Sequence, residues 1–231
     1  MNDDTLPTVD TPSLAIEGEP RRFPVRRVFC IGRNYPWDAP PAGSDPAREP
    51  PFFFMKPADA VVAATGTIPH PPLTDDFCHE IELVVAIGKD GTDIAPHAAL
   101  AHVWGYAAGL DLTRRDLQRD AKALGRPWEG AKAFDASAPC SPLVRAAAIG
   151  HPRDGAIWLT VNGALRQRST LAALIWPVAD VIAYLSRSVR LGAGDLIFTG
   201  TPAGVGPLRP GDVVRGGIDG VNEFTFAIGP R

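Results

Sequence analysis

The chain has 231 residues, of which 45% are hydrophobic and 21% charged, and its formal net charge is −3. Its length suits one domain with a sizeable core, or at most two small domains. The slightly acidic balance gives no basic footprint for nucleic acid, and no apolar run reaches the roughly 18 residues of a membrane-spanning helix.

The spacing of the cysteines and the numbers of glycines and prolines limit the possible fold classes further. Cys30, Cys78 and Cys140 are widely spaced and form no Cys-x-x-Cys pair. We therefore expect reduced, mostly buried thiols and neither disulfides nor a structural zinc site. The 23 glycines and 24 prolines divide the chain into short segments, a composition that predicts strands and turns with few helices.

The N-terminal third begins with a polar segment. Residues 1–24 lack the apolar region of a signal peptide, so we expect a mobile tail and a cytoplasmic protein. Residues 25–31 and 52–55 are two apolar segments typical of strands. Residues 36–51 between them are rich in Pro, Ala, Gly and Asp, and a loop of this length is typical of a lid or a binding segment.

Two further strands are predicted in the middle of the chain. Residues 80–88 form a strong apolar strand, and the Asp90-Gly91 pair that follows is a hairpin signal. Residues 103–110 read as a strand, with helix as the alternative, and Asp111 stands at its end.

The clearest helix covers residues 113–124. Thr113 fits the N-cap, Asp116 stands three residues later as in a capping box, and Gly125 fits the helix end.

The C-terminal half contains a second predicted helix over residues 177–189. Before it, residues 157–161 with Asn162-Gly163 predict a hairpin strand and its turn. The last fifty residues consist of short strands separated by glycine- and proline-containing turns.

Three carboxylates stand out as candidate metal ligands. Glu80 and Glu82 are two apart in a predicted strand and therefore share a face. Together with Asp111 they offer the oxygen ligands that a hard divalent cation prefers. The alternative is a solvated face of an edge strand. His79 points to the opposite face, where a core or supporting role is favoured over a ligand role.

Several polar residues follow Asp111. Arg115 and Gln118 share a helix face, with Lys122 four residues beyond, and would point at whatever the metal binds. A surface salt-bridge pattern is the equal alternative. Lys132 lies among small and aromatic residues, as expected of an anion partner or a tuned acid or base.

The glycine-rich segment 199–206 has two readings. Its backbone N–H groups and hydroxyls could hold an anion, although a structural turn is the better interpretation. It lacks the Lys-Ser/Thr of a phosphate-binding P-loop. We find no Gly-x-Ser-x-Gly nucleophile motif.

Taken together, these segments resemble the fumarylacetoacetate hydrolase family, in its short form without a separate N-terminal domain. The matching stretches occur in the family's order: Gly32-Arg33-Asn34-Tyr35, Phe54-Met55-Lys56-Pro57, His79-Glu80-Ile81-Glu82-Leu83, residues 109–118, Lys132-Ala133-Phe134-Asp135 and residues 199–206. Each stretch is modest alone, but the ordered set is specific and covers residues 25–229. Residues 49–60 are similar to fumarylpyruvate or acylpyruvate hydrolases.

The resemblance implies an α+β, mainly β fold in which mixed β-sheets roll around a central metal site. It implies one catalytic domain over residues 25–231, usually in a homodimer. It also implies Mg²⁺ or Mn²⁺ on Glu80, Glu82 and Asp111, with Ca²⁺ possible in a crystal.

The resemblance further implies a small 2-oxo acid as substrate, with no nucleic acid or membrane partner. Lys132 is assigned to catalysis. Arg115, Gln118, Thr201 and Lys56 are assigned to substrate binding.

One segment departs from the family pattern. Hydrolases of the family usually use a His–Glu pair on a lid to activate water. Here Asp38 stands in place of the His and Pro41 in place of the Glu. Asp38 or the later Glu49 would have to replace the base, and a free Asp is a weak base at neutral pH.

Three functions remain open at this point. The first is hydrolysis of a C–C bond in an acylpyruvate such as fumarylpyruvate. The second is decarboxylation or keto–enol isomerisation of a 2-oxo acid such as oxaloacetate, which needs no attacking water. The third is a degenerate protein that binds a metal and a 2-oxo acid without turnover.

Overall fold

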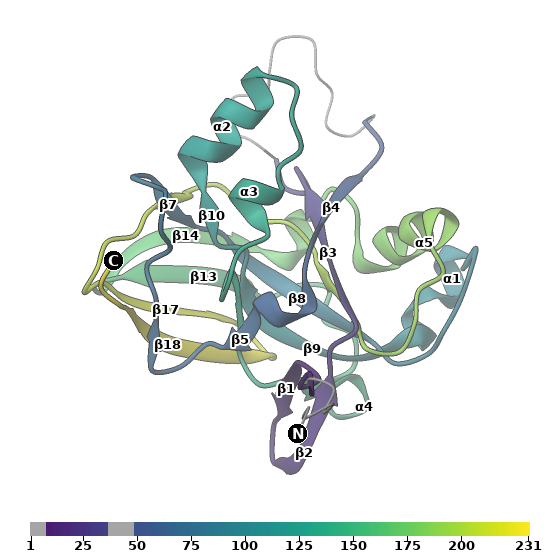
Figure 1. Cartoon of the computed structure of the whole chain (residues 1–231). Coiled ribbons are helices and arrows are strands. Elements are labelled where there is room, and N and C mark those ends of the chain that lie inside the picture. Colours follow the sequence, from purple (N-terminus) through teal and green to yellow (C-terminus); the bar gives the residue numbers. More distant parts are fainter. Residues whose placement is uncertain (1–7, 37–48) are drawn as a thin grey trace, which may run out of the picture.

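The computed structural model describes residues 8–36 and 49–231. Two curved sheets make up most of this part of the chain, and helices lie around their edges (Figure 1). Within the described residues the larger sheet has eight strands of mixed direction and the smaller has five. The expected fold class, mainly β with mixed sheets and few helices, is confirmed.

The larger sheet contains the strands predicted in the N-terminal half. Its order is β4 (Phe52–Lys56), β3 (Arg27–Gly32), β15 (Asp195–Phe198), β8 (Ile81–Ile87), β9 (Val103–Leu110), β11 (Ala138–Cys140) and β5 (Val61–Ala63), with β12 (Val144–Arg145) beside β9. The expected strands 25–31, 52–55, 80–88 and 103–110 differ from the observed bounds by two residues at most.

The smaller sheet contains the predicted hairpin. Its order is β14 (Ala164–Thr170), β13 (Ala156–Val161), β17 (Val213–Ile218), β18 (Asn222–Ile228) and β6 (Thr67–Ile68). The turn between β13 and β14 is the expected Asn162-Gly163 pair, with φ angles of 52° and 78°. Two positive φ angles are what a tight hairpin turn requires.

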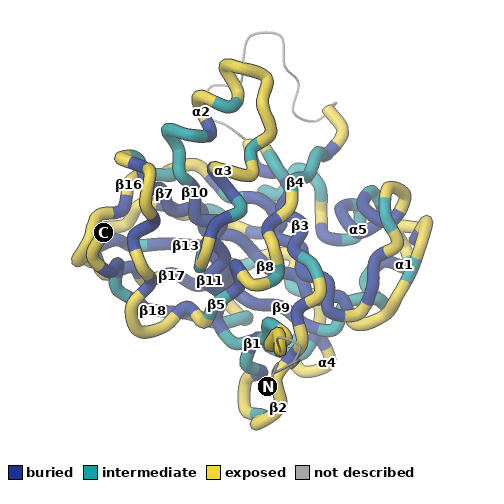
Figure 2. The backbone as a smooth tube through the Cα atoms, viewed as in Figure 1, coloured by how far each residue is buried: buried dark blue, intermediate teal, exposed yellow. Residues whose placement is uncertain are grey.

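Strand β8 lies at the centre of the structure, and all of its residues are buried. The odd-numbered residues from Ile81 to Ile87 belong to the core shared with the smaller sheet, whereas Val84 and Ala86 belong to a second core. Figure 2 shows the buried centre of both sheets and the exposed rim. Alternation along the strand places Glu82 on the face of the second core.

A three-stranded sheet and the helices complete the described structure. The small sheet has the order β10 (Thr113–Arg114), β7 (Phe77–His79) and β16 (Gly206–Pro207). The helices are α1 (Pro96–Ala99), α2 (Arg115–Ala123), α3 (Glu129–Lys132), α4 (Ala146–Ile149), α5 (Val178–Ser188) and the 3₁₀ turns η1 (Ala58–Ala60), η2 (Leu100–His102) and η3 (Leu171–Ala173). In Figure 1, α2 and α3 lie together beside β10.

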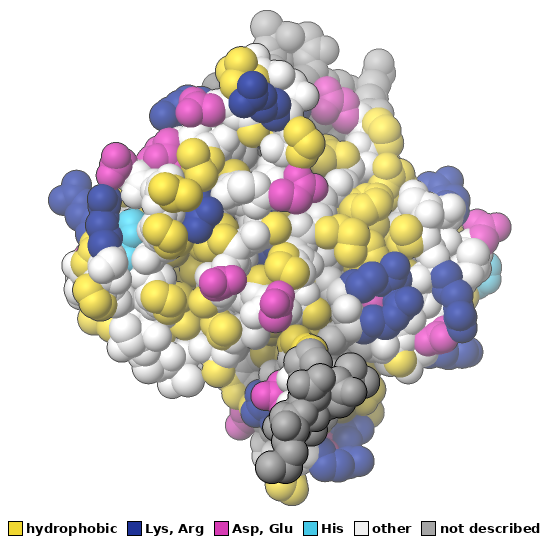
Figure 3. Space-filling view, viewed as in Figure 1, with side chains coloured by type: hydrophobic (Ala, Val, Ile, Leu, Met, Phe, Trp, Pro, Cys, Tyr) yellow, Lys and Arg dark blue, Asp and Glu magenta, His cyan; other side chains and the backbone are white. Residues whose placement is uncertain are grey.

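The helix expected over residues 177–189 is confirmed as α5. In the part of the chain that the structure describes, no helix has both the length and the hydrophobicity needed to cross a bilayer. On the face drawn in Figure 3, acidic and basic side chains are interspersed, so the charge of that face is mixed in sign.

The expectation of a mobile tail over residues 1–24 is wrong for its second half. The strands β1 (Ser13–Ile16) and β2 (Glu19–Pro24) form an antiparallel hairpin. Leu14 and Phe23 are buried in the second core, and the Phe23 ring lies 5.0 Å from that of Trp104. The polar local sequence did not predict this hairpin, because the residues against which it packs, such as Trp104, are distant in the sequence.

The helix after Asp111 begins later than expected. Thr113 belongs to β10 and not to an N-cap, and its hydroxyl donates to the Asp111 carbonyl at 3.0 Å. The Asp116 carboxylate accepts from its own first turn and from a neighbouring loop. Gly125, with φ of 61°, ends the helix as expected.

The Asp90-Gly91 pair does not close a hairpin. Strands β8 and β9 are connected through α1 and η2, and Gly91 forms an isolated bridge with Leu191. All three cysteines are buried and unpaired, as expected.

We predict that Phe23→Ala lowers the free energy of unfolding by about 3 kcal/mol, because it removes a large side chain from the second core. Urea denaturation would measure the change. The control is Val9→Ala, since Val9 is 88% exposed and should contribute little. Equal stability of the Phe23 variant and the wild type would show that the hairpin does not stabilise the fold.

Candidate active site

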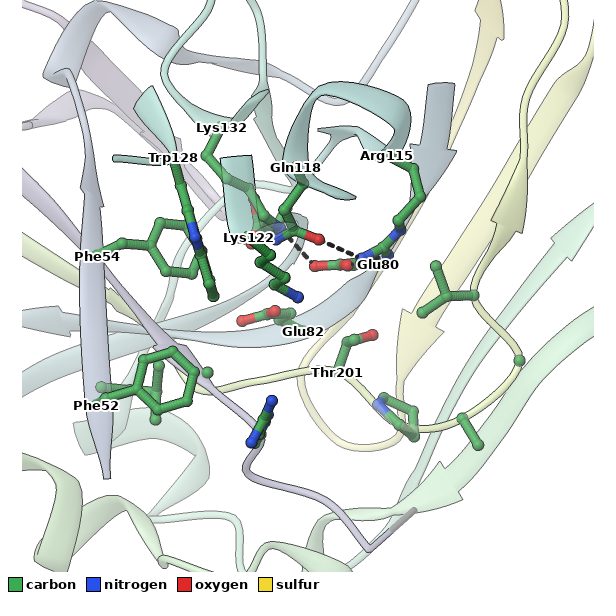
Figure 4. Close-up of a pocket in the computed structure, with 18 residues that line it drawn as sticks. Phe52, Phe54, Glu80, Glu82, Arg115, Gln118, Lys122, Trp128, Lys132 and Thr201 are labelled. Atoms are coloured by element: carbon green, nitrogen blue, oxygen red, sulfur yellow. Dashed lines mark hydrogen bonds and ion pairs between the residues drawn. The ribbon is translucent and has the colours of Figure 1, made fainter. Parts of the chain in front are cut away.

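A cavity of about 460 Å³ opens between β8, α2, α3 and the segment after β15. Figure 4 shows Glu80 and Glu82 among the lining residues, with Arg115 and Gln118 beside Glu80. Its lining residues include the carboxylates Glu80, Glu82 and Asp111, the cations Arg33, Arg115, Lys122 and Lys132, and the aromatic residues Phe52, Phe54 and Trp128. Thr201 and its neighbours form the remaining wall.

The three predicted metal ligands converge in this cavity. Glu80 stands in the break between β7 and β8, Glu82 in β8, and Asp111 directly after β9. The Asp111 N–H donates to the Glu80 carbonyl at 2.9 Å, which fixes the two strand ends together. All three side chains are buried, and one carboxylate oxygen from each lies within 4.8 Å of the others.

Cationic side chains neutralise two of these carboxylates. Lys132 donates to Glu80 at 2.7 Å and to Asp111 at 2.6 Å. Lys56 lies 2.9 Å from Asp111 Oδ1, and Arg115 donates to Glu80. Burial alone would lower the pKa of Lys132, but Asp111 and Glu80 outweigh it and raise that pKa above its ordinary value. Lys132 therefore carries its proton at neutral pH.

Glu82 contacts no cationic side chain among the described residues. Its Oε2 accepts only from the Gly200 N–H, at 2.7 Å. Burial, and then the charges of Asp111 and Glu80, raise its pKa well above the usual range. Ionised Glu82 is therefore the least compensated charge of the three.

These residues fit a divalent metal ion. The donors are hard carboxylate oxygens, they come from three separate side chains, and they are shielded from water. Asp111 Oδ1 is buried and accepts no hydrogen bond from the described residues, although Lys56 pairs with it electrostatically. A cation would also offset the charge of Glu82.

Helix α2 directs polar groups at the carboxylates. Arg115 donates to Gln118 Oε1 at 2.7 Å as well as to Glu80, so its guanidinium is held in place from two sides. Gln118 is buried on the same helix face. The structure thus brings together both residues that the sequence assigned to this wall.

Thr201 is held from beneath by a fully buried amide. Gln167, in β14, donates through Nε2 to Thr201 Oγ1 at 2.9 Å and to the Pro202 carbonyl at 2.8 Å. Thr201 in turn donates to the Ile81 carbonyl at 2.8 Å. The Gln167 amide therefore connects the smaller sheet to the wall of the cavity.

The other end of that amide fixes His79. Gln167 Oε1 accepts from the Ile81 N–H at 3.2 Å and lies 2.8 Å from His79 Nδ1. Because backbone groups orient the amide at both ends, His79 must donate from Nδ1, which leaves Nε2 unprotonated. Burial lowers the pKa of His79 and favours this neutral form. The expected supporting role for His79 agrees with this geometry.

Two expected site residues, Lys56 and Glu49, lie outside the cavity lining. Lys56 does not line the cavity: it stands behind Asp111, donating to the carbonyls of Leu112 and Lys132, and not on the substrate side. Glu49 is exposed, 3.8 Å from Arg33, and outside the cavity lining. Asp38 lies outside the described residues.

Sequence reasoning missed Gln167 and the aromatic wall. Gln167 is the buried residue within an otherwise largely exposed strand, so a polar residue at a core position was the available signal. Trp128 contacts Phe52 and Phe54 at ring distances of 5.9 and 5.7 Å. Nothing in the local pattern of these aromatic residues indicated that they would meet.

Comparisons with known proteins agree with this geometry. The family described as Fumarylacetoacetate (FAA) hydrolase C-terminal matches residues 27–228. A fumarylpyruvate hydrolase of Ralstonia sp is 42% identical over 186 residues, covering 80% of this chain and 96% of that protein.

Two further similar proteins differ in their stated activities. The mitochondrial oxaloacetate tautomerase FAHD1 of Mus musculus is 39% identical over 203 residues, covering 88% of this chain and 91% of that protein. The crystal structure of fumarylpyruvate hydrolase from Pseudomonas aeruginosa in complex with Mn²⁺ and pyruvate is 52% identical. It has a TM-score of 0.94 and covers 99% of this chain and 100% of that chain.

We predict that Glu82→Gln weakens Mn²⁺ binding by about 100-fold, at the upper end of the losses caused by removing even outer partners of a metal site. The thermal midpoint of the metal-free variant should equal or exceed that of the wild type, because an uncompensated buried charge is removed. Titration calorimetry and thermal unfolding measure the two effects. Glu129→Gln, at an exposed glutamate, is the control. Unchanged Mn²⁺ affinity would exclude Glu82 as a ligand.

We also predict that Gln167→Met lowers the free energy of unfolding by about 3 kcal/mol, since several buried partners lose their hydrogen bonds. Chemical denaturation measures the change. Arg168→Met, at the exposed neighbour on the same strand, is the control. A loss no larger than that of the control would mean that the amide network contributes little.

Proposed function

The chain belongs to the fumarylacetoacetate hydrolase family, and on that premise we propose that it is a metal-dependent hydrolase of an acylpyruvate such as fumarylpyruvate. The observation that carries the proposal is the buried group of Glu80, Glu82 and Asp111 in the floor of the cavity. The similar fumarylpyruvate hydrolase that binds Mn²⁺ and pyruvate supports it. The reaction would add water to fumarylpyruvate and yield fumarate and pyruvate.

Glu80, Glu82 and Asp111 would hold the ion, which we propose to be Mg²⁺ or Mn²⁺. Such an ion supplies Lewis-acid polarisation of the 2-oxo acid and so favours the negative charge that develops during cleavage. Ca²⁺ has the same preference for oxygen ligands and is a possible occupant in a crystal.

The surrounding residues have separate tasks in this proposal. Lys132 keeps its proton, so it would act as a hydrogen-bond donor and not as a base. Its three N–H groups donate to Glu80, Asp111 and Thr113, so it would reach developing negative charge by exchanging one of these partners. Arg115 and Thr201 line the cavity beside the carboxylates and would orient the substrate carboxylate, with Gln118 beside Arg115. Lys56 would act indirectly, by positioning Asp111.

The base that activates water is proposed from the sequence. Asp38 replaces the usual His of the family's lid pair, and Glu49 is the second candidate. Glu49 lies 3.8 Å from Arg33 and outside the cavity lining. We therefore favour Asp38.

The alternative function is tautomerisation or decarboxylation of a 2-oxo acid such as oxaloacetate. The mouse oxaloacetate tautomerase favours it, because its identity to this chain is close to that of the Ralstonia hydrolase. The replacement of the His–Glu pair by Asp38 and Pro41 also favours it, since neither reaction needs an attacking water. A degenerate binding protein is the remaining reading, and the complete set of carboxylates with Lys132 argues against it.

Three general features complete the proposal. We propose a single catalytic domain over residues 25–231, a homodimer and a cytoplasmic location. The ligand is a small molecule, in keeping with the enzymes to which the chain is similar.

We predict that the protein with Mn²⁺ converts fumarylpyruvate into fumarate and pyruvate, and that a chelator abolishes this turnover. Chromatographic detection of both products distinguishes hydrolysis from tautomerisation of the same substrate. Oxaloacetate is assayed in parallel for loss of its enol form and for release of pyruvate.

The variants identify the reaction. Glu82→Gln should abolish turnover of either substrate, whereas Asp38→Ala should impair hydrolysis alone. Glu49→Gln is its matched control in the same segment. Intact fumarylpyruvate together with metal-dependent turnover of oxaloacetate would contradict the hydrolase proposal and establish the alternative.

A further inference from the structure

Lys122 differs from the other cations that line the cavity. Lys132 and Arg115 are paired with the buried carboxylates, and Arg33 lies 3.8 Å from Glu49. Lys122 forms no hydrogen bond or ion pair with its side chain among the described residues. Its charge is thus available to a ligand.

An aromatic platform holds the Lys122 side chain. Its Nζ lies 4.7 Å from the centre of the Trp128 ring, within range of a cation–π interaction. The Trp128 ring is braced by Phe52, edge-on at 5.9 Å, and by Phe54 at 5.7 Å. Figure 4 shows the ammonium group pointing into the cavity and not away from it. Lys122 is itself an exposed residue, and its contact with Trp128 keeps the ammonium group beside the cavity.

The electric field at Lys122 favours an anion. Burial lowers the pKa of Lys122, and the nearby charges of Arg115 and Arg33 lower it further. Among the described residues, the attractive charge that acts on Lys122 is that of Glu80, which Lys132 and Arg115 already pair with. A carboxylate beside Lys122 would relieve this excess of positive charge.

The position of Lys122 on α2 sets its distance from the proposed metal site. Arg115, Gln118 and Lys122 occupy positions i, i+3 and i+7, so they share one helix face. Seven residues of helical rise place the Cα atom of Lys122 about 10 Å beyond that of Arg115. Arg115 reaches the metal ligands, whereas Lys122 stands farther along the wall, beside Trp128.

We propose that Lys122, supported by Trp128, binds a carboxylate at the far end of an extended 2-oxo dicarboxylate. The inference rests on the proposed function, which assigns the 2-oxo acid end of the ligand to the metal site. It makes Lys122 a residue that determines specificity: the proposed metal ion on Glu80, Glu82 and Asp111 would bind the 2-oxo acid, and Lys122 would bind the second carboxylate.

The test uses two ligands that differ only in that charge. 2-Oxoheptanedioate and 2-oxoheptanoate have the same seven-carbon chain, and neither has the 2,4-dioxo group that the proposed hydrolysis cleaves. Titration calorimetry on the Mn²⁺-loaded protein gives their affinities without turnover. We expect the wild type to bind the dicarboxylate about tenfold more tightly, as one charge-assisted hydrogen bond would produce.

Variants locate the source of that preference. Lys122→Met should bring the two affinities close to parity, and Lys122→Arg should retain part of the difference. Lys89→Met removes the same charge from an exposed position away from the cavity and should keep the wild-type ratio.

Four results would overturn the inference: no preference in the wild type, no binding of either ligand, a preference that survives Lys122→Met, or an equal loss in Lys89→Met. If the preference depends on Lys122 but fumarylpyruvate is not hydrolysed, the second-carboxylate site stands and the proposed reaction fails. The two failures are therefore distinguishable.

Discussion

The structure depends on keeping three carboxylates buried within 4.8 Å of one another. Buried ionised groups are costly unless they are paired. Lys132, Lys56 and Arg115 contact Glu80 and Asp111, whereas in the part of the chain that the structure describes Glu82 accepts from a backbone N–H alone. Two of the three buried charges are thus paired with cationic side chains, and a divalent ion would offset the charge of the third, Glu82.

The two sheets hold the three carboxylates in place. Strand β8 is covered on both faces by the two cores, and Glu82 is buried within it. The hydrogen bond from the Asp111 N–H to the Glu80 carbonyl joins the ends of two strands that are distant in the sequence. The Gln167 amide then ties the second sheet to the same place, through His79 on one side and Thr201 on the other. A rigid frame of backbone hydrogen bonds therefore positions the polar groups.

The features predicted correctly from the sequence are those governed by short-range periodicity. Two glutamates at i and i+2 in an apolar strand, followed by an aspartate after the next strand, predicted the group of carboxylates that the structure brings together, and the family resemblance favoured a metal site over a solvated strand face. Contacts between segments that are distant in the sequence could not be predicted from short-range periodicity. Thr113 matched a helix cap locally, but pairing with β7 placed it in a strand. Lys56 matched a substrate contact by its motif, but the packing of β4 placed it behind Asp111. In both cases tertiary contacts outweighed a local signal.

The division of charges in the cavity bears on how members of one family carry out different reactions. At the inner end, Lys132, Lys56 and Arg115 are paired with Glu80 and Asp111. On our proposal the metal ion there would bind the 2-oxo acid that hydrolysis, tautomerisation and decarboxylation share. At the outer end, Lys122 contacts Trp128 and pairs with no carboxylate among the described residues. On our proposal, a change there would alter the accepted substrate without disturbing the buried ion pairs. Selection of substrate and stabilisation of charge are thus assigned to different residues of α2, two helical turns apart, and the first can vary while the second is kept.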